Sequence, residues 1–392
     1  MNTKDSNLIV HIATDEKFID SAYAIYEKAF PGMNLFLILK RKEEVDILYL
    51  KQIDKYIFVN TNFDFVNVVE DYSKAARIIV FHGMNYFQAI LANKISKHSK
   101  QYVWSVFGGE VYNNNLIIKN GSVGLKTYKN FIFSYKKLIK DFFRPAYNLF
   151  FLGIGFPNKL VKKSFMKIDF TAVLYDEELN YYKKLGIVSS NIKHLKFTYY
   201  PFDLVINKYD NFANGKNILV GNSASYTNNH LEIFEILEKF DLINYKIIAP
   251  LSYGNLEYAK KIIDLGKEKF CDRFYPLTQF IPLQEYQKVL QGCSIVIMNH
   301  HRQQAIGNVM NAVYIGAKVF LSEKNTLFHY LKRIGCHIFS VEHDLIVENK
   351  EVFNLLTIQQ MSDNRAIVSS ELSLDNLVTE LRDKLSPLLL AD

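Results

Sequence analysis

The 392-residue sequence has few cysteines and no long apolar run, and each absence excludes a class of protein. Cys271, Cys293 and Cys336 form no C-x-x-C pair, so neither a disulfide framework nor a zinc-thiolate site is indicated. Residues 1–18 lack the apolar core of a signal peptide. The apolar stretch at 149–156 is far shorter than the roughly 20 residues of a spanning helix. We therefore expect a cytoplasmic protein that does not cross a membrane.

The sequence also has no D-x-D motif, the usual means of holding a divalent ion on a sugar nucleotide. The adjacent His300 and His301 are poor candidates for a metal site, because neighbouring loop residues seldom ligate one ion. We therefore predict no metal and no other cofactor. Gly and Pro are also sparse, at 17 and 8 residues, so no long part of the chain is predicted to be disordered.

Positive charge, in contrast, is concentrated in residues 126–167, which hold ten basic residues and one acid, Asp141. Apolar residues at helical spacing between 128 and 143 predict an amphipathic helix. Such a helix is suited to an anionic membrane surface, but it is equally typical of a core-packed helix with a solvated outer face, and both interpretations stay open. No recognised nucleic-acid motif accompanies the charge, so nucleic acid is not an expected partner. The candidate membrane-facing residues are Lys129, Phe131, Lys136, Lys137, Lys140, Phe142, Phe143 and Arg144.

Short apolar runs alternate with helical patterns along nearly the whole chain, which is typical of βαβ units and parallel sheets. The length favours two domains, and the polar stretch 206–216 interrupts the pattern. We predict an α/β protein with two Rossmann-like domains facing across a cleft. The predicted boundaries are 1–205 for the N-terminal domain, 206–216 for the linker and 217–392 for the C-terminal domain, which ends in a helix near 370–389.

In the C-terminal half, two loops follow strand-like runs, where ligands of open parallel sheets bind. The first begins with Gly221–Ser223, a turn whose glycine lets a ligand approach and whose amides and hydroxyl suit phosphate. Asn229 and Glu232 predict an N-cap and capping-box partner for a helix starting near His230. Taken alone, this is more often only a turn.

The second loop leads into a helix near Gly307, and a helix N-terminus attracts anions. Arg302 adds a guanidinium fork suited to phosphate. Two such loops in one half predict a site for a nucleoside diphosphate, with a polar surface loop as the alternative. The residues assigned to it are Gly221, Asn222, Ser223, Arg302, Gln303, Gln304, Gly307 and Asn308.

In the N-terminal half, two strand-like runs end in residues suited to acid–base chemistry, His82 and Glu110. Either could take the proton of an acceptor hydroxyl, and Glu110 is the first choice. His82 could instead be a hydrogen-bonded structural residue at a strand end. His11 and Asp15, near the end of the first strand, are expected to line the same cleft.

Together these segments resemble glycosyltransferase family 56, the family of the 4-acetamido-4,6-dideoxygalactose transferase of enterobacterial common antigen. The resemblance rests on Phe81–Gly83, Trp104–Tyr112, Ile218–Ser223 with Asn228–His230, Arg302–Gly307 and Asn325. It implies a GT-B fold, a dTDP-linked amino-deoxysugar donor and a polyprenyl-diphosphate-linked oligosaccharide acceptor at the inner face of the cytoplasmic membrane. It adds His230 and Asn325 to the donor site and Trp104 to the acceptor side.

We therefore interpret the chain as a metal-independent, peripheral membrane glycosyltransferase of bacterial surface polysaccharide synthesis, with a single inverting displacement. If configuration is instead retained, no base is required, and Glu110 and His82 become positioning residues. One alternative is a sugar-nucleotide 2-epimerase of the same fold. Another is a nucleotide-sugar binding protein without turnover. The oligomeric state is not predicted.

Overall fold

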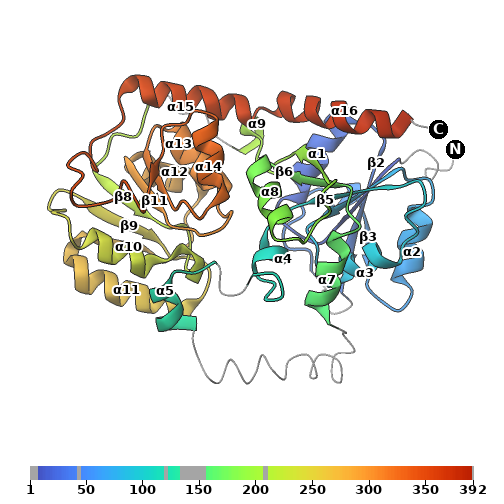
Figure 1. The fold of residues 1–392 in the computed structure, drawn as a ribbon, viewed down its shortest axis with the longest axis horizontal. Coiled ribbons are helices and arrows are strands. Elements are labelled where there is room, and N and C mark those ends of the chain that lie inside the picture. Colours follow the sequence, from blue (N-terminus) through green and yellow to red (C-terminus); the bar gives the residue numbers. More distant parts are fainter. Residues whose placement is uncertain (1–7, 42–45, 119–121, 133–155, 206–210, 391–392) are drawn as a thin grey trace. The chain divides into compact units, whose positions relative to one another are not determined.

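The computed structural model describes residues 8–41, 46–118, 122–132, 156–205 and 211–390. The chain forms two compact units, which are described separately (Figure 1). Unit 1 comprises Met1–Lys119, Phe143–Ile206 and Leu372–Asp392. Unit 2 comprises Asn120–Phe142 and Asn207–Glu371.

Unit 1 contains a 7-stranded parallel sheet in the order β3-β2-β1-β4-β5-β6-β7. The central strands are apolar on both faces because helices cover both, as a parallel sheet requires. The strands are β1 Ile9–Ala13, β2 Asn34–Lys40, β3 Tyr56–Asn60, β4 Ile78–His82, β5 Gln101–Ser105, β6 Phe170–Val173 and β7 Lys193–Lys196.

Two apolar clusters cover the faces of this sheet. One packs α2, α3, α7 and α8 against it, and the other packs α1 and the C-terminal α16. Asn85 closes a capping box with Gln88, which fixes the start of α3 directly after β4. The helices are α1 Ile19–Ala29, α2 Phe65–Tyr72, α3 Tyr86–Lys94, α4 Gly109–Tyr112, α7 Pro157–Phe165, α8 Asp176–Lys184, α9 Phe202–Val205 and α16 Leu374–Leu390, with a short 3-10 turn η1 at Ile53–Lys55.

Unit 2 contains a 6-stranded parallel sheet in the order β10-β9-β8-β11-β12-β13. The strand order switches sides between β8 and β11, which pair directly and in parallel: β9 and β10 extend the sheet beyond β8, and β12 and β13 extend it beyond β11. Ligands of open α/β sheets bind at such a switch point. The strands are β8 Asn217–Val220, β9 Lys246–Pro250, β10 Phe274–Leu277, β11 Ile295–Met298, β12 Lys318–Leu321 and β13 Phe339–Ser340.

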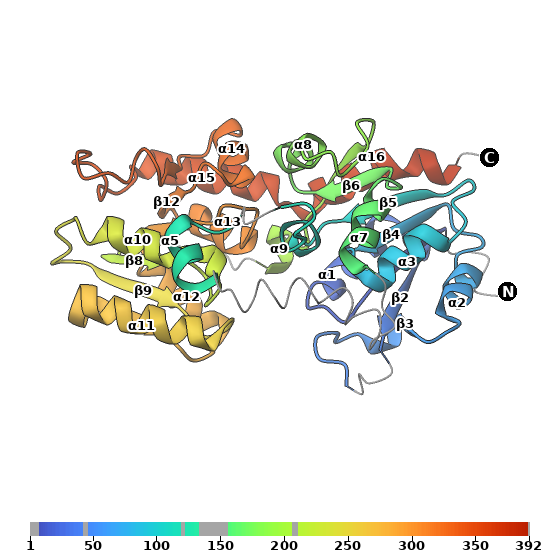
Figure 2. The same ribbon diagram turned by 60° about the horizontal axis from the view of Figure 1, so that its bottom comes forward.

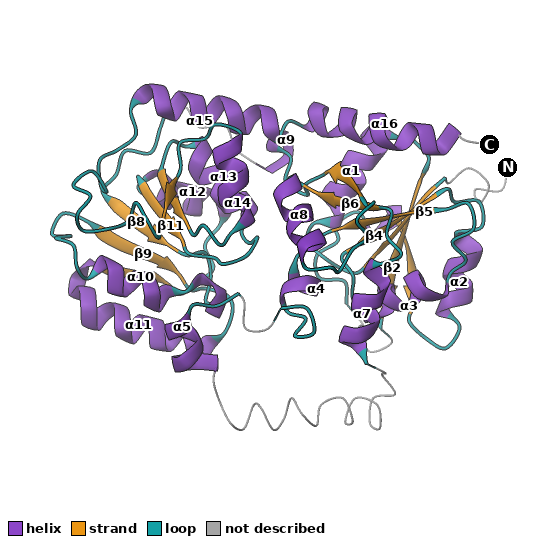
Figure 3. Ribbon diagram, in the orientation of Figure 1, coloured by secondary structure: helices purple, strands orange, loops and turns teal. Residues whose placement is uncertain are grey.

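In unit 2, α10 and α11 lie on one face of the sheet, and α12, α13 and α14 lie on the other (Figure 3). The short α5 lies beside α10 in both ribbon views (Figure 2). The helices are α5 Leu125–Thr127, α10 His230–Leu237, α11 Leu256–Phe270, α12 Leu283–Gln291, α13 Ile306–Tyr314, α14 Thr326–Arg333 and α15 Ile358–Glu371. A π-helical turn, η2 Tyr128–Ile132, follows α5, and 3-10 turns occupy Tyr226–Asn228 and Cys271–Arg273.

The unit boundaries differ from the sequence prediction of one break between 205 and 217. The terminal helix α16, expected in the second domain, packs on α1 of unit 1, where Arg382 donates to the carbonyl oxygens of Lys28 and Ala29. Of the predicted linker, 206–210 lies outside the described residues. The remainder is packed on unit 2, because Ala213 N donates to Ile315 O at 2.8 Å.

Residues 122–132 were also predicted to belong to the N-terminal domain, but they dock on α10 in unit 2. Asn229 Oδ1 accepts from Gly124 N at 2.7 Å, and Glu232 accepts from the backbone N–H groups of Lys126 and Thr127. These contacts replace the predicted cap: Asn229 is left-handed, with φ 52°, and its side chain caps no helix. The predicted helix start at His230 is nevertheless observed.

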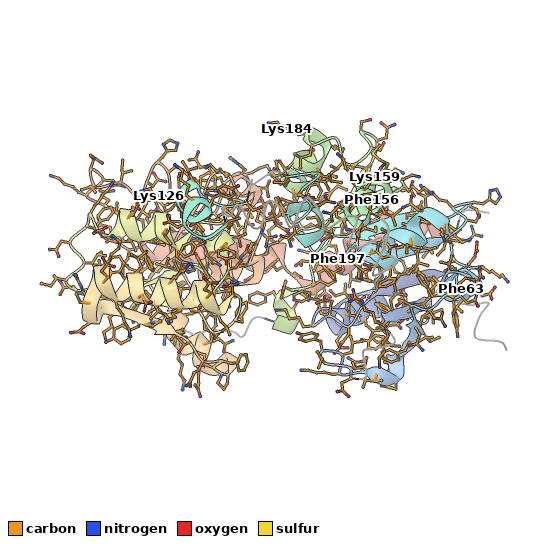
Figure 4. All side chains as sticks on the ribbon, turned by 90° about the horizontal axis from the view of Figure 1, so that it is seen from below. Phe63, Lys126, Phe156, Lys159, Lys184 and Phe197 are labelled. Carbon is orange, nitrogen blue, oxygen red and sulfur yellow. The ribbon has the colours of Figure 1, made fainter. Side chains whose placement is uncertain are left out.

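The basic window is therefore divided between the units. Figure 4 shows Lys126 on the α5 segment of unit 2 and Lys159 on α7 of unit 1. Of the predicted membrane-facing residues, Lys129 is exposed, but Phe131 packs on unit 2 itself, with its ring centroid 4.9 Å from that of Tyr258. Phe131 is thus a correction to the prediction. The other six candidates, Lys136, Lys137, Lys140, Phe142, Phe143 and Arg144, lie outside the described residues. Within the described ranges, no helix is long and apolar enough to cross a membrane.

Candidate active site

The two predicted phosphate loops of unit 2 meet at the carboxyl edge of its sheet. Because β8 and β11 are paired, the loops that follow them leave the sheet side by side. Gly221 N donates to Ile297 O at 3.0 Å, and Asn229 Nδ2 donates to Asn299 O at 2.7 Å. The sequence prediction that these loops belong to one site is therefore consistent with their positions.

His300 connects the two loops on their buried side. Its Nε2 lies 3.1 Å from Asn222 Oδ1 and 2.9 Å from Asn228 Oδ1, both of which are acceptors. Nε2 therefore carries the proton. The imidazole is fully buried, and burial lowers its pKa to about 3, with the charge of Arg302 adding to the effect. At neutral pH His300 is an uncharged support of the loops.

On its solvent side, the network consists of polar side chains that remain partly exposed. Gln304 is its hub: its Oε1 accepts from Thr227 Oγ1 at 2.6 Å and from Arg302 Nε at 3.0 Å. Gln304 Nε2 lies 3.3 Å from Asn222 Oδ1, whose Nδ2 donates to Tyr253 Oη. Sequence reasoning missed Thr227 and Tyr253, because neither belongs to a glycine turn or a charged motif.

Helix α13 begins directly after this network. Its N-cap residue, Ala305, has a left-handed φ of 54° and provides no side-chain cap, and the first turn contains no acid. The early amides are thus not satisfied by a capping side chain, which favours an anion at this end. Gln303, Gly307 and Asn308, which the sequence assigned to the donor site, lie here and are partly exposed.

Three residues that the sequence assigned to binding the nucleotide-sugar donor lie in the closely packed layer beneath the two loops. Gly221 has a φ of +70°, and a Cβ there would lie 2.6 Å from Asn228 Oδ1 and 2.7 Å from His230 Nε2. The glycine thus permits close packing of the loop on itself. His230 is fully buried with Nδ1 3.0 Å from Tyr258 Oη, and burial lowers its pKa to about 3. Asn325, also buried, caps α14 by accepting from Leu327 N.

Ser223, the last of the predicted donor residues, is also largely enclosed. Its Oγ accepts from Asn228 Nδ2 at 3.1 Å. Ser223, His230 and Asn325 are therefore placed as structural supports, which corrects their predicted contact with the donor.

In unit 1, His11, His82 and Tyr199 form a buried hydrogen-bonded chain beneath the sheet edge. Asn34 Nδ2 donates to three oxygens, so Asn34 Oδ1 must accept from His11 Nε2, 3.2 Å away. His11 Nδ1 then accepts from His82 Nε2 at 3.0 Å, and His82 Nδ1 accepts from Tyr199 Oη at 2.9 Å. The tautomers of both imidazoles are fixed by this order.

Neither imidazole is suited to meet a substrate. Both are fully buried; burial lowers the pKa of His82 to about 3 and, together with the charge of His82, lowers that of His11 well below its ordinary value. The prediction that His82 is a second catalytic base and that His11 lines a cleft is therefore corrected. Both residues order the sheet edge instead.

Glu110 lies at the start of α4, after a turn through Gly108 with φ 91°. Its Oε1 accepts from Trp104 Nε1 at 2.9 Å and from Phe107 N at 3.0 Å, which fixes the carboxylate at the carboxyl edge of β5. The side chain is half-buried. Trp104 is itself fully buried against Phe165, so its predicted place in a cleft is corrected to a positioning role for Glu110.

The loop after β1 contains one predicted carboxylate and one that sequence reasoning missed. Asp15 accepts from the backbone N–H groups of Leu48, Tyr49 and Leu50, so it anchors a neighbouring loop. The adjacent Glu16 is half-buried, and burial, with the charge of Asp15, raises its pKa. The missed signal was its position in the loop that follows a parallel strand, three residues after the end of β1. Among the described residues, no group of three or more His, Cys, Asp and Glu side chains could hold a metal ion.

Solved structures with the same architecture define the class. The sucrose-phosphate synthase of Thermosynechococcus elongatus matches 98% of this chain and 100% of its own, with a TM-score of 0.64 and 10% identity. The Anabaena HepE protein in complex with UDP matches over 97% and 99%, at a TM-score of 0.66 and 10% identity. A Rickettsia africae glycosyltransferase matches over 99% and 100%, at 0.63 and 12%. The fold is GT-B, as the sequence predicted.

The sequence itself places the chain within this class. The profile of the family described as "4-alpha-L-fucosyltransferase glycosyl transferase group 56" matches residues 170–367, half of the chain. The protein belongs to this family and is a glycosyltransferase. The matched range contains both loops of the unit 2 network, whereas Glu110 lies outside it.

Proposed function

We propose that this glycosyltransferase moves a deoxyamino sugar, similar to 4-acetamido-4,6-dideoxygalactose, from a dTDP-linked donor to a polyprenyl-diphosphate-linked oligosaccharide. The observation that carries the donor half of this proposal is the hydrogen-bonded network that joins the loops after β8 and β11 beside the uncapped start of α13. In support, the similar Anabaena protein was crystallised with UDP.

The diphosphate would lie against the partly exposed side chains on the solvent side of the network. Arg302 would supply positive charge, its guanidinium held in place by Gln304. The amides at the start of α13 would take the remaining phosphate oxygens. Fixed donors of this kind stabilise the negative charge of the departing nucleotide, so a bound metal ion is not needed in the proposed mechanism.

Glu110 would accept the proton of the acceptor hydroxyl as that oxygen attacks the sugar carbon and the diphosphate departs. The N–H groups of Trp104 and Phe107 hold the carboxylate in one orientation, which is the geometric requirement for a general base. Such a base fits a single displacement with inversion of configuration. Glu16, whose pKa is raised, replaces His82 as the second candidate base.

The lipid-linked acceptor would place the enzyme at the inner face of the cytoplasmic membrane. Exposed Lys129 of unit 2 and Lys159, Lys162 and Lys163 of unit 1 offer positive charge to an anionic surface, whereas Lys126 is paired with Glu235. Apolar side chains also reach solvent near these lysines in the sequence, with Leu125 66% and Phe156 56% exposed. Binding to anionic vesicles that weakens with salt would support this part of the proposal.

The two sequence-based alternatives make different predictions. A 2-epimerase would convert a free nucleotide sugar without an acceptor, and a binding protein would form no product with any acceptor. The family assignment favours neither of them.

The donor site can be tested by calorimetry with dTDP and UDP in the presence of EDTA. Arg302→Ala should weaken nucleotide binding by about 10- to 100-fold, the contribution of a charge-assisted hydrogen bond. Arg273→Ala is the matched control, since Arg273 precedes β10 and lies at the opposite edge of the same sheet. Equal affinity in both variants and the wild type would refute this donor site, and binding that requires a divalent ion would refute metal independence.

A further inference from the structure

Unit 2 contains a pocket of about 430 Å³ beside the phosphate network. It lies between one side of α10 and the segment that follows β13, at the carboxyl edge of the sheet. Ile236 of α10, Val341 and Leu345 form much of its apolar wall. Leu125 of the docked α5 segment lines it as well.

The pocket has polar groups of two kinds. Two of its three carboxylates are already engaged: Glu232 accepts from the amides and hydroxyl of the docked segment, and Glu342 accepts from Ser322 Oγ and Glu323 N. Glu348 is the third carboxylate of the lining. By contrast, the ammonium groups of Lys239 and Lys324 form no ion pair or hydrogen bond with any described residue. The pocket therefore offers a ligand the N–H donors of two lysines, beside the single carboxylate of Glu348.

A single loop connects this pocket to the phosphate network. His300 faces the network through Asn222 and Asn228, whereas the next residue, His301, lines the pocket. Burial and the charge of Lys324 lower the pKa of His301 to about 4, so its imidazole is neutral at pH 7 and can both donate to and accept from hydroxyl groups. Because the residues that face the two sites are neighbours in the sequence, a molecule whose diphosphate binds the network would lie directly beside this pocket.

The lining is better suited to a sugar than to a nucleobase. Sugars combine an apolar ring face with many hydroxyl groups, which matches an aliphatic wall rimmed by lysine, histidine and the Asn299 amide. Apart from His301 the lining contains no aromatic ring on which a base could stack.

We propose, building on the donor site proposed above, that this pocket receives the sugar of the nucleotide donor. The preferred sugar carries a substituent with an acceptor oxygen, an amide carbonyl or a carboxylate, which Lys239 and Lys324 bind. The pocket thereby selects which sugar is transferred.

Saturation-transfer NMR in the presence of dTDP tests this directly, with N-acetylglucosamine, glucuronate and glucose as probes. The wild type should show signals for the first two sugars and weaker signals for glucose. Ile236→Trp, which fills the pocket, should abolish the sugar signals and leave those of dTDP. Ile243→Trp is the matched control, because Ile243 follows α10 outside the pocket and is 73% exposed.

A milder pair of variants separates recognition from misfolding. Lys239→Met should reduce affinity for N-acetylglucosamine or glucuronate by about 10-fold, the contribution of one hydrogen bond to a charged group, with little effect on glucose. Lys267→Met, on the exposed side of α11, should change nothing. Whichever of the two sugars loses more affinity identifies the substituent.

The pocket proposal is overturned if the wild type binds none of these sugars, or if Ile236→Trp binds them as the wild type does. Failure of the donor-site proposal would look different, because dTDP signals would then be missing from the wild type whatever the sugars do.

Discussion

The carboxyl edges of the two sheets contain similar residue types but hold them at different depths. In unit 1, His11, His82 and Tyr199 are enclosed and satisfy one another, and the half-buried carboxylates of Glu16 and Glu110 lie at the edge. In unit 2, imidazoles again lie below, but a layer of partly exposed amide, hydroxyl and guanidinium groups covers them. The partly exposed groups are thus carboxylates in unit 1 and amide, hydroxyl and guanidinium groups in unit 2, which suits the base and the anion site proposed above.

Acidification should affect both edges strongly. His11, His82, His230 and His300 are fully buried with lowered pKa values. Below about pH 6.5 the unfolded chain binds protons that the folded units do not, so the free energy of unfolding falls as pH decreases. Each imidazole contributes up to about 1.4 kcal/mol per pH unit until the pH approaches its folded pKa, about 3 for His82.

Urea unfolding between pH 7.5 and 5 measures this loss, and two probes separate the units. The single tryptophan, Trp104, lies in the core of unit 1, so its fluorescence follows that unit alone, whereas circular dichroism follows both. His98→Ala removes an exposed imidazole and should leave the slope unchanged. A stability that does not vary over this pH range would show that the imidazoles are not buried in neutral form.

Removing the proton acceptor of unit 1 should decrease turnover without affecting the donor site of unit 2. Glu110→Gln keeps the shape of the side chain but removes its basicity, so kcat should fall by about 1,000-fold. Affinity for dTDP should stay within about twofold, because binding energy and basicity come from different units in this proposal. Glu16→Gln, measured in the same transfer assay, would identify the base if Glu110→Gln retained activity.

The dense packing beneath the unit 2 network predicts a smaller effect on stability. Gly221→Ala should destabilise unit 2 by about 2–4 kcal/mol, because a Cβ would overlap Asn228 and His230 and φ is +70°. Gly32→Ala is the matched control: its φ is +69°, but nothing lies within 4 Å of the new Cβ, so only about 1 kcal/mol of backbone strain is expected. Equal losses in the two variants would mean that the close contacts at Gly221 do not matter.

The sequence predicted the elements that have strong local signals. The parallel strands at β1, β4, β8 and β11 and the loops after the last two follow from apolar runs ending in polar residues. The sequence assigned both of these loops to one site, and in the structure they adjoin because neighbouring parallel strands end at the same edge of a sheet.

The failures all depend on long-range contacts. No local pattern shows that His82 would pair with His11, 71 residues away, or that α16 would return to α1. Similarly, Asn229 and Glu232 have the spacing of a capping box, but a stronger set of partners, the backbone amides of 124–127, takes both side chains. Local propensity was overridden by tertiary hydrogen bonds.

The smallest expected effect concerns residues 122–132, the segment that docks on α10. A substitution there tests directly whether this segment belongs to unit 1 or to unit 2. Glu232→Ala removes the acceptor for the amides of Lys126 and Thr127, so their hydrogen exchange should accelerate by about 10-fold, the effect of losing roughly one hydrogen bond. Glu238→Ala, which removes an exposed partner of Lys269 at the C-terminal end of α10, should leave these amides unchanged. Because the segment belongs to unit 2, neither substitution should shift the unfolding followed by Trp104 fluorescence. A shift with Glu232→Ala would instead show that residues 122–132 stabilise unit 1, as the sequence alone predicted.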